Sequence, residues 1–216
     1  MQYHWLNKKN NKSLIIFFAG WSFDYIPFEF LDCKNNDVLV VYDYNDITYN
    51  LPNFDEYSEK YLISWSMGVY IAYLLKDKLP KFDKAIAVNG TIYPVDDILG
   101  IPQKTFELTL KFAETGLQGK FYKNVFNNDD FCEKYFEKPV ERRIENRVSE
   151  LISLQYLIKN TNIHYDGEYY DEAIVSLSDK IIPTKNQLVF WGSKAKTIDC
   201  GHFPFYNYSC WEDICN

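Results

Sequence analysis

Short apolar segments that alternate with stretches of helical character constrain the fold of this chain most strongly. Residues 14–19 and 38–42 are apolar at almost every position, which is typical of strands buried on both faces of a sheet. Residues 67–79 carry apolar side chains at helical spacing, and three shorter apolar runs occupy residues 61–63, 84–88 and 173–177. Strands separated by helices predict an α/β fold with a mostly parallel central sheet flanked by helices.

Residues 101–160 break this alternation. They contain charged, helix-favouring segments with apolar residues at a period of 3.6, as in residues 140–158. They hold ten basic and nine acidic residues, whereas the rest of the chain holds 13 basic and 21 acidic ones. No repeat or flexible linker separates them, so we expect one domain, with a core of residues 1–100 and 161–216 and an inserted helical lid of residues 101–160.

Charge and composition exclude several classes of partner. The 216 residues carry a formal net charge of −7, which disfavours nucleic acid because binding to phosphates needs clustered Lys and Arg. The longest apolar run is far too short to span a bilayer, and the first twelve residues lack the apolar segment of a secretory signal. The five scattered cysteines, without a CxxC pair, indicate reduced thiols and no metal site. We therefore expect a cytoplasmic monomer that binds neither membrane nor nucleic acid.

A nucleophile elbow is predicted where the strand at 61–63 meets the following helix. The sequence Ser64-Trp65-Ser66-Met67-Gly68 matches G-x-S-x-G, with Ser64 in place of the first glycine. A small residue is needed at position 64 because strand and helix approach closely there, and Ser is nearly as small as Gly. Gly68 is needed because a side chain at that position would strike the neighbouring strand. Ser66 is then the candidate nucleophile, whereas the alternative interpretation is a turn of small residues retained for packing.

An acid and a histidine follow in the order expected of such hydrolases, Ser then Asp then His. Asp179 comes directly after the apolar run at 173–177, and Asp171 is the alternative acid. His202 follows another short β-prone segment, whereas His4 lies near the N-terminus and His164 follows a polar turn. We predict a triad of Ser66, Asp179 and His202, against the alternative that His202 is an ordinary surface histidine.

Two backbone N–H groups are the candidate oxyanion donors. Met67 follows the nucleophile at a helix N-terminus, and Trp21 follows the strand that ends in Phe18-Ala19-Gly20. The rings of Trp21, Trp65 and Phe23 are candidates for an apolar wall of the substrate pocket. The alternative is that all three rings lie in the core, which is the commoner place for aromatic residues.

These features resemble the α/β-hydrolase superfamily over most of the chain. More closely, the chain resembles the BioG-type pimeloyl-acyl-carrier-protein methyl ester esterases of biotin synthesis. It departs from the family pattern at Ser64, where Ala or Gly is usual, and no lid residue matches a substrate role. The matching stretches are Phe18-Ala19-Gly20-Trp21, Val41-Tyr42-Asp43-Tyr44, Ser64-Trp65-Ser66-Met67-Gly68-Val69, Ala87-Val88-Asn89-Gly90-Thr91 with Gly100-Ile101-Pro102, Ser178-Asp179-Lys180-Ile181 and Gly201-His202.

The resemblance implies an α/β-hydrolase fold with an inserted helical lid and hydrolysis of a methyl ester at the far end of an acyl chain on acyl carrier protein. No metal or organic cofactor is needed. A broad-specificity carboxylesterase or an acyl thioesterase would use the same triad. A non-catalytic acyl-binding homologue is a further alternative, although such a protein has no reason to retain Ser, Asp and His together.

The acidic carrier protein requires a local basic patch on this acidic chain. Arg142, Arg143 and Arg147, near Lys138 and Lys159, form the densest cationic cluster. They are the candidate docking residues. The alternative is a solvated helix face whose charges are balanced by neighbouring glutamates.

Overall fold

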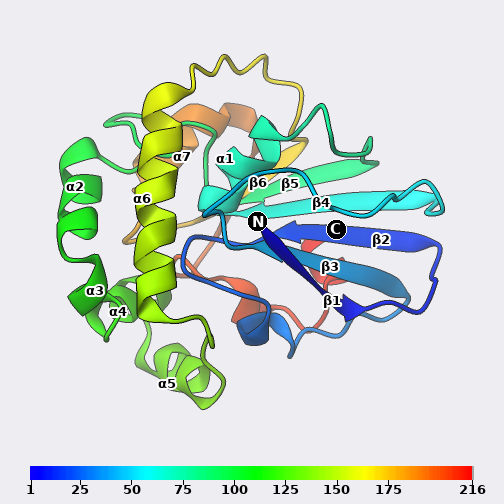
Figure 1. Cartoon of the computed structure of the whole chain (residues 1–216), viewed down its shortest axis with the longest axis horizontal. Helices are drawn as coiled ribbons and strands as arrows, with labels where there is room; N and C mark the ends of the chain where they lie inside the picture. The colour runs from blue at the N-terminus through cyan, green and yellow to red at the C-terminus, as the bar shows by residue number, and fades with distance from the viewer. Residues whose placement is uncertain (216) are drawn as a thin grey trace.

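The computed structural model describes residues 1–215 and contains one seven-stranded sheet in the order β1-β3-β2-β4-β5-β6-β7 (Figure 1). All neighbouring strands are parallel except β1 and β3. The strands are β1 (Gln2–Asn7), β2 (Ser13–Phe18), β3 (Asn36–Tyr42), β4 (Glu59–Trp65), β5 (Lys84–Val88), β6 (Glu172–Ser176) and β7 (Ala195–Ile198). The predicted mostly parallel α/β sheet is confirmed.

The central strands are apolar throughout because both faces of the sheet are covered. In β2, Leu14 and Ile16 belong to the core on one face, while Ile15 and Phe17 belong to the core on the other. All seven residues of β3 are buried as well. Burial of whole side chains on both faces explains why these strands read as continuous apolar runs.

The antiparallel edge strand β1 was not predicted. Its residues are exposed or half-buried, and it pairs with β3 from Gln2 opposite Tyr42 to Asn7 opposite Val38. An edge strand pairs with only one neighbouring strand and can keep polar side chains, so its sequence lacks the apolar run that marks the central strands.

Five helices lie between β5 and β6, within the predicted insertion of residues 101–160 (Figure 1). They are α2 (Gln103–Lys111), α3 (Ala113–Gly116), α4 (Lys120–Phe126), α5 (Asp129–Glu137) and α6 (Ile144–Asn160). The carboxyl end of β2 points toward them in Figure 1, where α6 stands between the sheet and α2. Leu151 and Leu154 of α6 are buried in the same core as α1, so this helix is packed onto the sheet layer.

The remaining helices flank the sheet outside the insertion. They are α1 (Met67–Leu74), α7 (Thr184–Trp191) and α8 (Glu212–Cys215), with short 3₁₀ turns η1 (Ile26–Phe28), η2 (Gly192–Lys194) and η3 (Phe205–Asn207). Among residues 1–215 there is no helix with both the length and the apolar character needed to cross a membrane.

Candidate active site

Ser66 occupies a strained turn between β4 and α1. Its φ of 56° and ψ of −123° lie in a region that residues other than glycine rarely adopt. The Ser66 N–H donates to the Val88 carbonyl at 3.0 Å, and the Ser66 carbonyl accepts from Val69 N–H at 3.1 Å. These bonds hold the turn in place, so the side chain projects from the carboxyl end of the sheet as an elbow requires.

Two glycines allow the elbow to pack this closely. A Cβ atom on Gly68 would lie 2.3 Å from the Phe18 carbonyl oxygen, which no side chain tolerates. A Cβ atom on Gly20 would lie 3.1 Å from the Ser66 Cβ atom. The loop after β2 therefore lies directly against the candidate nucleophile, and the need for a small residue at position 68 comes from the neighbouring strand.

The structure brings together the three residues predicted to form the triad. His202 Nε2 lies 2.9 Å from Ser66 Oγ, and His202 Nδ1 lies 2.8 Å from Asp179 Oδ2. Asp179 is in the loop after β6, and His202 is in the loop after β7. All three side chains are largely buried. The alternative acid, Asp171, accepts a hydrogen bond from Ala85 N–H instead.

The carboxylate of Asp179 is surrounded by donors. Oδ1 accepts from the N–H groups of Ile181 at 2.8 Å and Ile182 at 2.9 Å, and Oδ2 also accepts from Gln187 Nε2 at 2.9 Å. A carboxylate accepts only, so His202 Nδ1 carries a proton and Nε2 is left as the acceptor for the Ser66 hydroxyl. This is the tautomer that a general base needs.

Trp65 and Asn89 hold the loop that carries the histidine. Trp65 Nε1 and Asn89 Nδ2 both donate to the His202 carbonyl, at 2.8 and 2.9 Å. Asn89 also exchanges two hydrogen bonds of 2.7 Å with Ser176 at the end of β6. No role for Asn89 was predicted from the sequence, although its Asn-Gly-Thr segment is one of the stretches that carry the family resemblance.

The prediction that Trp65 and Phe23 line a substrate pocket is wrong. Both side chains are about 1% exposed and belong to the core on the face of the sheet away from the cavity, with Phe28 and Phe203. The cavity lies on the opposite face, because lining residues such as Met67, Phe106 and Leu151 belong to the core on that face. Of the three rings considered, that of Trp21 alone lines the cavity.

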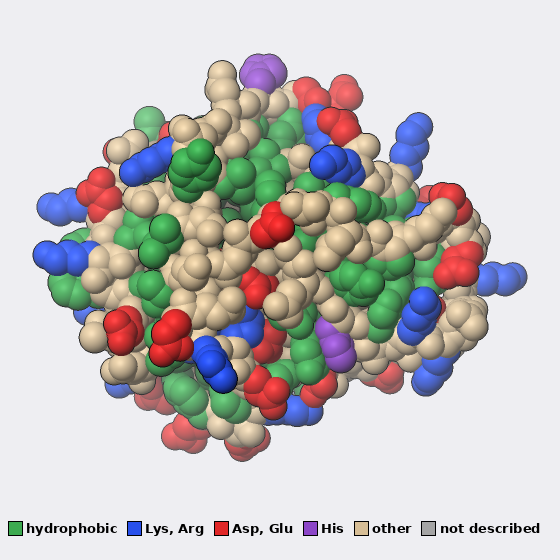
Figure 2. Space-filling model, in the orientation of Figure 1, with side chains coloured by type: hydrophobic (Ala, Val, Ile, Leu, Met, Phe, Trp, Pro, Cys, Tyr) green, Lys and Arg blue, Asp and Glu red, His purple; other side chains and the backbone are tan. Residues whose placement is uncertain are grey.

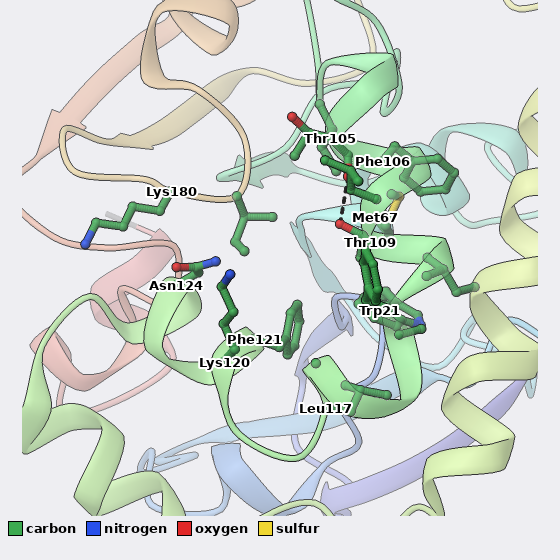
Figure 3. A pocket seen from close by; sticks show the side chains of 17 residues that line it. Trp21, Met67, Thr105, Phe106, Thr109, Leu117, Lys120, Phe121, Asn124 and Lys180 are labelled. Atoms are coloured by element: carbon green, nitrogen blue, oxygen red, sulfur yellow. Dashed lines mark hydrogen bonds between the residues drawn. The ribbon is translucent and has the colours of Figure 1, made fainter.

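A cavity of about 390 Å³ lies between the elbow and the lid helices (Figure 3). Both Trp21 and Met67 line it. Met67 follows Ser66 in the sequence, and Trp21 follows Gly20, which lies against Ser66. In Figure 3, Lys120, Asn124 and Lys180 lie on one side of the cavity, across from Trp21 and Leu117. The other lining residues are Ile101, Thr105, Phe106, Leu108, Thr109, Phe112, Ala113, Gly116, Phe121, Leu151 and Ile181. Most of this apolar lining comes from the insertion, where the period-3.6 pattern predicted helices but assigned no residue to the substrate pocket.

The backbone N–H groups of Trp21 and Met67 are the two predicted oxyanion donors. Within residues 1–215 neither donates a hydrogen bond. Met67 is the first residue of α1, where the helix dipole favours negative charge. Gly20, next to Trp21, lies against Ser66. Both N–H groups therefore remain candidates to bind the negative charge that would develop during attack by Ser66.

Two of the three arginines predicted to dock a partner are buried instead. Arg142 forms ion pairs with Glu150 at 2.9 Å and with Asp43 at 3.2 Å, and 8% of its side chain is exposed. Arg147 is 5% exposed and donates to the hydroxyl groups of Ser22 and Tyr122. The prediction is therefore wrong for Arg142 and Arg147, because internal acceptors use their charges and donors. Arg143 is exposed, and its docking role stays a prediction.

Comparisons of sequence and of structure with known proteins both indicate the BioG family. The sequence model of the family "Pimeloyl-ACP methyl esterase BioG" matches residues 1–214. The crystal structure of BioG from Haemophilus influenzae superposes with a TM-score of 0.92 at 28% identity and covers 100% of both chains. An esterase from Exiguobacterium antarcticum has the same fold, with a TM-score of 0.64 at 13% identity over 95% of this chain and 89% of its own.

Curated relatives are more varied. A malonyl-[acyl-carrier protein] O-methyltransferase of Bacteroides fragilis is 32% identical over 83% of this chain, and the match spans only 36% of that protein. An uncharacterized protein of Haemophilus influenzae is 31% identical over 93% of both chains.

Proposed function

Since this chain belongs to the BioG family of pimeloyl-ACP methyl esterases, we propose that it hydrolyses the methyl ester of pimeloyl-acyl-carrier-protein methyl ester with Ser66 as the nucleophile. The observation that carries the proposal is the continuous chain of hydrogen bonds from Ser66 through His202 to Asp179 beside an apolar cavity. A side-chain nucleophile, its base and an orienting carboxylate are the parts that acyl transfer requires.

The reaction follows from this geometry. Ser66 Oγ attacks the ester carbonyl carbon while His202 Nε2 takes its proton, and Asp179 stabilises the resulting imidazolium. The N–H groups of Trp21 and Met67 hold the oxyanion of the tetrahedral intermediate. His202 then gives the proton to the departing methoxy group, which leaves as methanol. A water molecule deprotonated by His202 attacks the acyl-enzyme, and the intermediate collapses to release the free carboxylate and restore Ser66.

The cavity suits an aliphatic chain with a polar carrier at its outer end. Its walls are dominated by lid side chains such as Phe106, Leu117 and Phe121, which bury apolar surface against a hydrocarbon. Its volume of about 390 Å³ is within the range of small-molecule sites. A methyl ester at the far end of the acyl chain reaches Ser66 while the phosphopantetheine arm stays outside.

Exposed cations near the cavity are the candidates to bind the acidic carrier. Lys120 and Lys180 line the cavity and are exposed, and Arg143 is exposed at the start of α6. On the face shown in Figure 2, basic side chains are dispersed among acidic ones rather than gathered in one patch. We propose that the carrier docks over the cavity through Lys120 and Lys180.

Replacement of Ser66 tests the proposal, with Ser64 as the matched control. Both serines lie in the elbow and are buried, but the Ser64 hydroxyl has no hydrogen-bond partner among residues 1–215. A fluorophosphonate should label the wild type and Ser64→Ala at Ser66 and should not label Ser66→Ala. Labelling that persists in Ser66→Ala would contradict the assignment of the nucleophile.

The substrate is tested separately. Purified protein should hydrolyse pimeloyl-acyl-carrier-protein methyl ester and should support growth of a biotin auxotroph that lacks its own esterase, whereas Ser66→Ala should do neither. Hydrolysis of small soluble esters without activity on the carrier-bound ester would indicate a general carboxylesterase instead.

A further inference from the structure

Lid helix α6 is joined to the loop at residues 20–22 by three hydrogen bonds. Trp21 Nε1 donates to the Arg147 carbonyl at 2.7 Å, and Ser22 N–H donates to Glu150 Oε2 at 3.1 Å. The Arg147 guanidinium donates to Ser22 Oγ at 3.2 Å. The Trp21 N–H, one of the two proposed oxyanion donors, lies within the segment that these bonds fix.

The loop needs such support because Ser22 is held in an uncommon conformation. Its φ is 76°, in the region that favours glycine, and its side chain is completely buried. A serine stays in that conformation only where surrounding contacts over-determine it. The contacts from Glu150 and Arg147 supply that constraint from a helix distant in sequence.

Glu150 is the centre of this arrangement. It has no exposed surface, and its Oε1 accepts from Tyr44 N–H at 2.8 Å. Burial raises the pKa of Glu150, and the Arg142 guanidinium at 2.9 Å opposes that rise. The hydroxyl of Tyr44 in turn donates to the Ala19 carbonyl at 2.7 Å. Glu150 therefore supports the loop from both sides, through Ser22 after Trp21 and through Tyr44 before it.

We propose that Glu150 is a positioning residue that holds the Trp21 N–H where the oxyanion develops, so that the chemical step depends on α6 being seated on the core. The inference rests on the proposed function only for the use of Ser66 and the Trp21 N–H in ester cleavage. It does not depend on which ester is the natural substrate.

The effect belongs to the transition state more than to substrate binding. An oxyanion donor bonds most strongly to the charge that appears during attack, so a displaced donor lowers kcat more than it changes KM. Loss of a whole donor costs about 10²- to 10³-fold in kcat, and we expect a misplaced one to cost about 10- to 100-fold.

Glu150→Gln is the sharpest perturbation because it keeps the shape of the side chain. The amide has one acceptor oxygen, so its NH₂ group must face the N–H of Ser22 or of Tyr44. Asp43→Asn is the matched control. Asp43 is buried and pairs with the same Arg142, but it accepts no hydrogen bond from residues 19–22 in the described part of the chain.

The assay is hydrolysis of p-nitrophenyl butyrate, together with inhibition by an alkyl boronic acid that forms a tetrahedral adduct with Ser66. For Glu150→Gln we expect kcat to fall about 10- to 100-fold with KM nearly unchanged, and the boronic acid Ki to rise by a similar factor. Asp43→Asn should lose stability but keep kcat and Ki within about twofold of the wild type.

A folded Glu150→Gln protein with wild-type kcat, or with a changed KM alone, would overturn the inference, as would an equal loss of kcat in Asp43→Asn. If Glu150→Gln does not fold, Trp21→Phe provides the test, because it removes the bond to the Arg147 carbonyl and keeps the backbone N–H. It should lower kcat several-fold and raise the boronic acid Ki in parallel, and an unchanged kcat would overturn the inference. A wild type that cleaves p-nitrophenyl butyrate but not the carrier-bound ester contradicts the proposed substrate alone, whereas one inert toward both contradicts the inference too.

Discussion

Replacing Asp179 with Asn should remove the base function of His202 while leaving the fold almost intact. Two backbone N–H groups, of Ile181 and Ile182, point at Oδ1, so the amide oxygen of the variant will occupy that position. Its NH₂ group then faces His202 Nδ1. The imidazole must accept at Nδ1 and carry its proton on Nε2, which faces Ser66 Oγ at 2.9 Å.

The expected loss is large because this tautomer cannot take the serine proton. In serine proteases the equivalent change lowers kcat about 10⁴-fold, which corresponds to about 5.5 kcal/mol at 1.36 kcal/mol per tenfold. Stability should change much less. In the described part of the wild-type chain the buried Gln187 Oε1 has no hydrogen-bond partner, so a rotated Gln187 amide can accept from the new NH₂ group while it gives up its bond to the Ile182 carbonyl. The net cost is about 1–2 kcal/mol.

Steady-state hydrolysis of p-nitrophenyl butyrate measures the first effect, and urea denaturation measures the second. Asp171→Asn is the control, since Asp171 is exposed, bonds to Ala85 N–H and does not contact His202. We expect that variant to keep kcat within about twofold of the wild type. An Asp179→Asn protein that retains more than about a tenth of the wild-type kcat would refute the assignment of Asp179 as the orienting acid.

Two further changes test docking and stability. The double variant Lys120→Glu with Lys180→Glu should lose about tenfold or more of its activity on the carrier-bound ester at low salt and less of it at high salt. Its activity on p-nitrophenyl butyrate should change little. Equal losses of activity on both substrates would place carrier docking elsewhere. Asp37→Asn should destabilise the fold by about 2 kcal/mol at neutral pH in urea denaturation, because the buried Asp37 carboxylate accepts from Tyr57 and from the turn before β2. Burial raises the pKa of Asp37, but the hydrogen bonds lower it by more than burial raises it, so the pKa of Asp37 lies below its usual value of 3.8. The stabilisation is thus present above about pH 4 and is lost as the pH falls through the lower folded pKa, and a difference between Asp37→Asn and wild type that does not shrink in acid would contradict this account.

Strands β2 to β6 were predictable because their burial requires apolar residues that can be recognised in the sequence. A strand covered on both faces must be apolar at consecutive positions, and residues 14–19 and 38–42 meet that condition. The edge strand β1 is covered less, so polar residues such as Gln2 and Asn7 are compatible with it, and no local pattern marks it as a strand.

The candidate triad was predictable for a different reason. Its members follow strand ends in a fixed order along the chain, and parallel strands bring those ends to one edge of the sheet. The resemblance to the BioG family, confirmed by the match over residues 1–214, depends on the same segments. The catalytic roles of Ser66, Asp179 and His202 remain predictions that the substitutions above test.

Which side of the sheet a ring occupies was not predictable from the same sequence. Trp65 and Trp21 both lie next to the elbow, yet Trp65 packs in the core away from the cavity and Trp21 lines the cavity. The difference depends on the alternation of side chains about the strand and on the loop geometry, neither of which composition reports.

Whether an arginine of the insertion is buried or exposed was likewise not predictable from the sequence. The fully buried Glu150 of α6 needs a cation partner, because an unpaired buried carboxylate is too costly, and Arg142, two residues before the helix, supplies it. Removing one partner of such a buried pair costs about 3–5 kcal/mol, so an Arg142 variant would lose activity through the fold whatever its partner does. A charge reversal therefore reports on carrier docking only at exposed cations such as Lys120 and Lys180, which form no ion pair within residues 1–215.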